Sequence, residues 1–237
     1  MRTLVSFVSP ILLATTAFAD GAPAQRPVTQ PRATQAPAQP PAAQPAGARS
    51  PGAQRPMVQL APIDLTAIPA PCKPLANKAL APSLSIALSA RISLASCMAD
   101  HAIAPLSLCD CGDSIVAIDA AVQPAMKLLD DVIANADPAI QVIAEHAEGK
   151  LYTGLAARML ATLPAVAAGA SDDETTLRDM RKQTLEAQLA PWREAAMAAF
   201  QHVVDLAKAH PELATSPATA TAVRDSQQRV AANVAAR

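Results

Sequence analysis

Four cysteines are the residues whose type and spacing most clearly indicate chemistry. Cys72, Cys97, Cys109 and Cys111 are the only cysteines among 237 residues. An even number of cysteines in an exported chain indicates disulfides first. Of the three connectivities, we set aside the one that joins Cys109 to Cys111, because a bridge across a single residue strains disulfide geometry. We therefore expect Cys97 to bond either Cys109 or Cys111. Cys72 would bond whichever of those two remains.

A metal site is the alternative interpretation of the same region. Cys97 and His101 are four residues apart, which places them on one face of a helix. Cys109 and Cys111 could then complete a tetrahedral shell of thiolate and imidazole ligands, which suits Zn²⁺ or Cu⁺. The spacing C-x3-H-x7-C-x-C is not a familiar zinc pattern, and it leaves Cys72 without a role. Disulfides are therefore the first interpretation, and we expect no resident metal or other cofactor.

The sequence contains no G-x-S-x-G, H-E-x-x-H, Walker, Rossmann or C-x-x-C-H pattern. Glu145 and Glu148 are neighbours on a predicted helix, but a di-iron site needs Glu-x-x-His on two helices. We interpret the two acids as part of a solvated helix face. His202 and His210 are interpreted as partly exposed residues toward a helix C-terminus. We expect no catalytic residues and do not expect an enzyme.

The composition predicts an all-α protein and argues against nucleic acid as a partner. The chain is 51% hydrophobic but only 2% aromatic, and Ala, the best helix former and a poor strand former, supplies much of the apolar excess. The formal net charge is −1, with no run of five like charges. A nucleic-acid footprint or a polybasic membrane patch is therefore not indicated.

The N-terminal region indicates export. Residues 1–19 combine Arg2, an apolar stretch and small residues at Ala17 and Ala19, which is typical of a cleaved signal peptide. Residues 20–71 hold 12 of the 22 prolines, and they show no apolar periodicity. We expect a disordered Pro/Ala/Gln-rich tail there, either passive or acting as a spacer. Abundant Ala and more Arg than Lys are typical of a bacterial protein, so we expect a periplasmic or extracellular location and no membrane span after cleavage.

Residues 72–237 are expected to fold as a disulfide-stapled helical domain. Apolar residues at helical spacing, with capping residues and prolines at the ends, predict an antiparallel bundle of four to five helices. We expect Pro124 to kink one of them, and Pro191 to kink another or divide it in two. Asp113, Asp137 and a Ser171–Glu174 capping box are the expected N-terminal caps. The predicted helices are 83–101, which also alternates like a strand, 113–136, 138–163, 172–209 and a shorter helix after Ser216.

These observations together predict an exported, non-enzymatic helical protein that acts by protein–protein interaction. It would serve as a scaffold, an adaptor or an assembly subunit, including in the cell envelope, because a long amphipathic helix suits recognition by grooves. A metal-binding protein using Cys97, His101, Cys109 and Cys111 is the alternative function. A periplasmic helical chaperone, which shares the same general character, is the second alternative.

Overall fold

A computed structural model describes residues 60–235 of the chain. Within this range the protein is all-helical, with no strand, as the composition predicted. The predicted signal peptide (1–19), most of the predicted tail and the last two residues lie outside the described residues. The elements are two short 3₁₀ helices, η1 (Ala70–Cys72) and η2 (Pro211–Thr215), and the α-helices α1 (Lys73–Ala79), α2 (Leu84–Ile103), α3 (Gly112–Asn135), α4 (Pro138–Leu160), α5 (Asp172–Gln188), α6 (Ala190–Ala209) and α7 (Pro217–Ala235).

Several helix boundaries agree with the signals in the sequence. The segment with mixed periodicity is α2, a helix rather than a strand. Asp137 caps α4 by accepting a hydrogen bond from the backbone N–H of Ile140 at 3.0 Å. At the start of α5, Ser171 and Glu174 form the expected capping box, each side chain accepting a hydrogen bond from the other's backbone N–H.

Other details differ from the expectation of four to five helices. The described residues contain seven α-helices, because the short α1 was not anticipated and the predicted helix 172–209 is divided. The division falls at Leu189, and Pro191 lies in the first turn of α6, where its missing N–H costs no hydrogen bond. Asp113 is not the N-cap of α3, because Cys111 occupies that position. Asp113 lies in the first turn of the helix, where its negative charge interacts favourably with the helix dipole. Pro124 lies inside α3, and a kink there stays a prediction.

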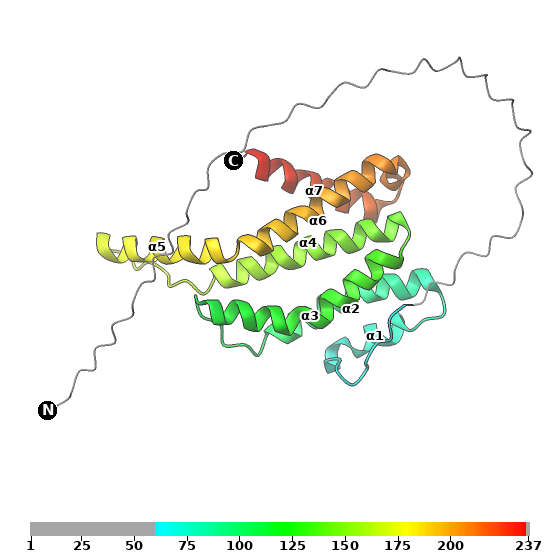
Figure 1. Ribbon diagram of the computed structural model, residues 1–237, viewed down its shortest axis with the longest axis horizontal. Coiled ribbons are helices and arrows are strands. Elements are labelled where there is room, and N and C mark those ends of the chain that lie inside the picture. The colour runs from blue at the N-terminus through cyan, green and yellow to red at the C-terminus, as the bar shows by residue number, and fades with distance from the viewer. Residues whose placement is uncertain (1–59, 236–237) are drawn as a thin grey trace, which may run out of the picture. The chain divides into compact units, whose positions relative to one another are not determined.

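Helix α4 is the central element of the packing. It contacts α2 and α3 on one side and α6 and α7 on another, and Figure 1 shows α4 and α6 running side by side. The largest core cluster lies among α2, α3 and α4 and extends to Leu185, Leu189 and Trp192 at the junction of α5 and α6. Because neighbours surround α4, its side chains point into several different interfaces.

One close approach fixes the distance between α4 and α6. The ring of Phe200, which is 1% exposed, lies against Gly149 of α4. A Cβ at position 149 would lie 2.7 Å from Phe200 Cε1 and 2.8 Å from Cζ, closer than real Cβ contacts. Gly149 is therefore needed at this position to make room for the ring.

The folded part of the chain begins before Cys72. Ile68 is 5% exposed and belongs to a small core cluster with Cys72 and Leu94. Further upstream, the carbonyl of Ala61 accepts a hydrogen bond from the Arg91 guanidinium at 2.7 Å. Residues 60–71, which we had assigned to the tail, thus pack against α2 and α3.

Candidate functional site

The four cysteines form two disulfides, but not in the expected pairing. Cys72 bonds Cys97, and Cys109 bonds Cys111. Our prediction that Cys97 would pair with Cys109 or Cys111 is wrong. The pairing we had set aside is the one present, with a Cα–Cα distance of 5.3 Å between Cys109 and Cys111, inside the ordinary range for a bridge.

The helical packing explains this pairing. α1 packs along α2, which places Cys72, at the start of α1, 5.8 Å from Cys97 of α2 between their Cα atoms. Cys109 and Cys111 belong to the loop that leads into α3, and Cys111 has the extended backbone of a helix N-cap. The sequence contains no signal for α1 strong enough to reveal the first contact.

The four residues of the metal alternative are not brought together. His101 lies near Cys72 and Cys97, the three potential ligand atoms lying within 4.8 Å of one another. Cys109 and Cys111 instead lie against the Ser114 hydroxyl. The sulfurs of Cys72 and Cys97 are bonded to each other and so do not offer thiolates. The described residues therefore do not form the Cys97, His101, Cys109 and Cys111 shell.

A buried ion pair holds the N-terminal segment against the core. Arg91 of α2 is 3% exposed, and its guanidinium donates to the carboxylate of Asp131 of α3 at 2.5 Å. Asp131 also accepts from the backbone N–H of Ala61 at 3.2 Å. Desolvation lowers the pKa of Arg91, and the nearby Asp131 charge opposes that effect. This network joins the N-terminal segment to α2 and α3 and so helps to hold the fold together.

The acids of α4 are not a solvated face, contrary to our interpretation. Glu145 is 6% exposed and accepts a 2.6 Å hydrogen bond from the His202 imidazole of α6. Glu148 is half-buried. Burial is the main cause that raises the pKa of Glu148 from 4.5 to about 7, and the negative charges of Glu145 and Asp130 add to the effect. Glu145 thus lies at the seam between α4 and α6 and links the two helices.

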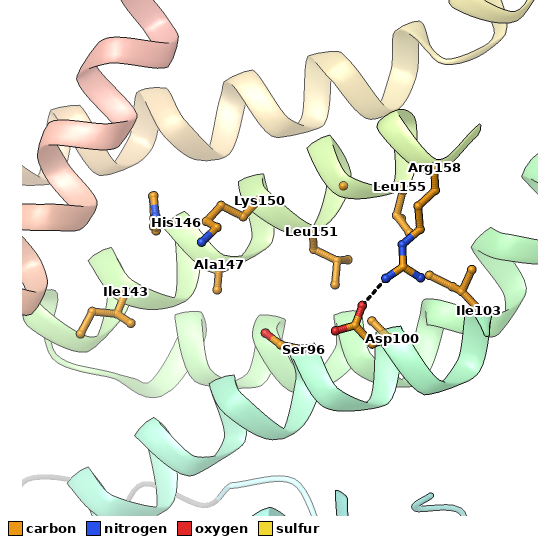
Figure 2. A pocket seen from close by; sticks show the side chains of 12 residues that line it. Ser96, Asp100, Ile103, Ile143, His146, Ala147, Lys150, Leu151, Leu155 and Arg158 are labelled. Atoms are coloured by element: carbon orange, nitrogen blue, oxygen red, sulfur yellow. Dashed lines mark hydrogen bonds and ion pairs between the residues drawn. The ribbon is translucent and has the colours of Figure 1, made fainter. Parts of the chain in front are cut away.

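The other side of α4 forms a groove with α2. The groove has a volume of about 370 Å³. Figure 2 shows side chains from both helices lining it, with the Arg158 guanidinium reaching from α4 to Asp100 of α2. Its apolar lining includes Ile103, Ile143, Leu151 and Leu155, and Gly154 leaves one position of the wall open.

The groove carries more positive than negative charge. Lys150 is exposed, and Arg158 is 44% exposed while it donates to Asp100 at 2.5 Å. His146, at one end, contacts the Ser226 hydroxyl of α7 at 3.2 Å. Burial lowers the pKa of His146, with Asp225 of α7 acting in the opposite direction. Burial thus works against the charged imidazolium, and because Asp100 offsets Arg158, the excess positive charge of the groove comes from Lys150.

Comparisons of the chain with models of known protein families, with curated proteins and with solved structures found no match. Among the helices between residues 60 and 235, none has the length and apolar character needed to cross a bilayer. The functional argument therefore depends on the geometry of the chain itself.

Sequence reasoning missed the groove although part of its signal was present. Ile143, Ala147 and Leu151 recur at helical spacing along α4, where they are only partly buried and line the groove. Lys150 and Arg158 follow these residues on the same side of α4. Basic residues flanking a half-buried apolar stripe are the pattern that could have indicated a binding face.

Proposed function

We propose that this chain is an exported helical protein that binds other proteins through the groove between α2 and α4. The occupant would be an acidic amphipathic helical segment of a partner. In this role the chain would act as a scaffold, adaptor or assembly subunit, with α2, α3, α4 and α6 as the antiparallel bundle that presents the groove. A periplasmic or cell-envelope location is part of the proposal.

The observation that carries the proposal is the combination of an apolar floor with Lys150 and Arg158 along one groove, Arg158 being paired there with Asp100. The lining runs from Ile143 to Arg158 on α4, a length of roughly 22 Å at 1.5 Å per residue. That length matches about four turns of a bound helix. Apolar residues at i, i+3, i+4 and i+7 would fill the floor, and acidic residues beside them would meet Lys150 and Arg158.

The export part of the proposal draws on chemistry and on the N-terminal sequence. Disulfides such as Cys72–Cys97 persist in oxidising compartments and are rare in the reducing cytosol of most organisms. Residues 1–19 have the composition of a signal peptide. Both features favour a compartment outside the cytoplasm.

Binding can be tested with a designed peptide of about 16 residues that carries a Leu stripe and Glu residues beside it. We expect fluorescence anisotropy to show saturable binding of this peptide, and no binding of a matched peptide with Lys in place of Glu. Lys150→Glu combined with Arg158→Glu should weaken binding by about tenfold or more, since each tenfold corresponds to about 1.4 kcal/mol. Lys182→Glu, on α5 and outside the groove, is the matched control and should leave affinity unchanged.

Gly154 offers a second test that does not depend on charge. A Cβ there has nothing within 4 Å, so Gly154→Ala should leave the groove open, whereas Gly154→Leu should fill part of it. Both substitutions favour the helix relative to Gly, so loss of folding does not confound the comparison. Binding retained in both Gly154→Leu and the charge-reversal variant would exclude the groove as the binding site.

A further inference from the structure

We propose that Cys109–Cys111 is a redox-active disulfide that oxidises a pair of thiols in another protein. This activity is separate from the binding function of the α2–α4 groove. It is inferred from the position of the bridge, the exposure of Cys109, and the hydrogen-bond donors that surround the pair.

The two disulfides of this chain differ in what they connect. Cys72–Cys97 closes a separation of 25 residues and joins α1 to α2, and Cys72 is fully buried. Cys109–Cys111 closes a separation of 2 residues within a single loop. A bridge across so short a stretch removes little freedom from the unfolded chain and ties no second element to the fold. Stabilisation of the fold therefore does not account for the second bridge.

Cys109 is the more exposed residue of the bridge. Cys109 is exposed in the loop before α3, whereas Cys111 is half-buried. Thiol–disulfide exchange needs an attacking thiolate to reach one sulfur while the other departs. The difference in exposure assigns Cys109 as the sulfur attacked and Cys111 as the leaving group.

The surroundings of Cys111 suit a departing thiolate. Cys111 is the N-cap of α3, a 24-residue helix whose N-terminus carries partial positive charge. The neighbouring acid, Asp110, lies 3.9 Å from the Arg181 guanidinium of α5. Asp113, in the first turn of α3, contributes the opposing negative charge.

Ser114 supplies a hydrogen-bond donor aimed at both sulfurs. Its side chain is 4% exposed, and its oxygen accepts from the backbone N–H of Cys109 at 2.8 Å. The hydroxyl hydrogen remains to be donated to Cys109 Sγ at 3.2 Å or Cys111 Sγ at 3.7 Å. When the bridge opens, the same hydroxyl can stabilise a thiolate on either sulfur. Ser114 is thus a positioning residue for this exchange.

The reaction balances as a two-electron exchange. A thiolate of the partner attacks Cys109 Sγ, a mixed disulfide forms, and the Cys109–Cys111 bond breaks with its electron pair leaving on Cys111. The partner's second thiolate then attacks its own sulfur in the mixed disulfide and releases Cys109. The partner gains a disulfide, and the two protons lost by its thiols protonate Cys109 and Cys111. A small-molecule disulfide such as oxidised glutathione restores the bridge and is itself reduced to two thiols.

The test uses the full chain and a fluorogenic peptide that carries two cysteines, with oxidised glutathione as the terminal oxidant. We expect the chain to accelerate peptide oxidation at least tenfold over oxidised glutathione alone. The double variant Cys109→Ser with Cys111→Ser should lose this acceleration, and Cys72→Ser with Cys97→Ser should keep it if circular dichroism shows that it is folded. With a one-cysteine peptide in place of the two-cysteine peptide, and oxidised glutathione to convert Cys109 to a glutathione mixed disulfide, the single variant Cys111→Ser should accumulate a mixed disulfide between Cys109 and the peptide, detectable by intact mass, because no second thiol on either molecule releases it.

Ser114 and the redox equilibrium provide the remaining readouts. Ser114→Ala should slow peptide oxidation and lower the thiolate absorbance of the reduced chain at 240 nm, with helicity unchanged. In glutathione buffers of increasing reducing strength, alkylation and mass analysis should show Cys109–Cys111 opening before Cys72–Cys97. Equal peptide oxidation by the wild-type chain and the Cys109/Cys111 double variant would overturn the proposal. So would a bridge that stays closed after Cys72–Cys97 has opened.

Discussion

Two glycines of α4 respond to the same substitution in opposite directions. Gly149 and Gly154 are both interior to the helix, where Ala is favoured over Gly by about 1 kcal/mol. At Gly154 an added Cβ meets nothing within 4 Å, so Gly154→Ala should stabilise the protein by about that amount. At Gly149 the same methyl group would lie 2.7 to 2.9 Å from three atoms of the Phe200 ring.

The Phe200 ring has little room to move away from a new methyl group. Phe200 is only 1% exposed, and its ring is tilted against the His146 ring, with 5.9 Å between the two ring centroids. On the α7 side, Cζ of Arg229 lies 5.0 Å from the centroid of the Phe200 ring. Overpacking of such a site costs about 1–3 kcal/mol. After subtraction of the gain in helix propensity, Gly149→Ala should destabilise the protein by up to about 2 kcal/mol.

Urea unfolding followed by circular dichroism at 222 nm measures the difference between the two variants. We expect Gly154→Ala to exceed Gly149→Ala in unfolding free energy by about 1–3 kcal/mol. In a Phe200→Leu background the ring is removed, and Gly149→Ala should then become neutral or stabilising. If the two alanine variants are equally stabilised in the wild-type background, the close approach of α4 and α6 at Gly149 is refuted.

Three further predictions concern the buried polar groups and the structural disulfide. Asp131→Ala leaves the buried Arg91 guanidinium without its carboxylate and should cost about 3–5 kcal/mol in urea unfolding, whereas Arg91→Met should cost less because no charge is left unpaired. A smaller loss for Asp131→Ala than for Arg91→Met would contradict this. Because the pKa of Glu148 rises from 4.5 to about 7 on folding, the folded state holds the proton more tightly, so stability should fall as pH rises from about 4.5 to 7. The free energy of unfolding of Glu148→Gln, measured relative to wild type, should therefore rise by about 1–2 kcal/mol between pH 5 and pH 8, after a discount for solvent screening at this half-buried site. A stability difference between the two proteins that does not change with pH would exclude the effect. Removing the Cys72–Cys97 bridge should lower the free energy of unfolding by about 3–4 kcal/mol, the value that the chain-entropy model gives for a loop of this length. Urea unfolding of the double variant Cys72→Ser with Cys97→Ser measures this loss. An unchanged urea midpoint would show that packing alone holds α1 in place.

The helices could be predicted from the sequence because their signals are local. Asp137 followed by Pro138, and Ser171 followed by Glu174, mark helix starts through contacts between residues three positions apart. The class of the fold followed from the abundance of Ala and the scarcity of aromatic residues. Asp113 was wrongly assigned as a cap because Cys111, without a side-chain cap hydrogen bond, gives no such signal.

The disulfide pairing and the buried polar pairs could not be predicted because they depend on contacts between distant residues. Arg91 and Asp131 are 40 positions apart, and Glu145 and His202 are 57 apart. Nothing in the sequence near either residue of a pair identifies its partner. The pairing of Cys72 with Cys97 likewise depends on how α1 packs against α2, which was not predicted.

The position of α4 explains how the apolar and charged residues of this helix are distributed. Because α2, α3, α6 and α7 all contact it, apolar residues are distributed around most of its circumference, and its charged residues lie at the seams between neighbours. Glu145 lies at the α6 seam and is buried there, whereas Lys150 and Arg158 lie at the α2 seam beside an open groove. Substitutions on one helix should therefore divide by seam: those at Glu145 and Gly149 should change the free energy of unfolding. Those at Lys150 and Arg158, and Gly154→Leu, should change binding while leaving the fold intact.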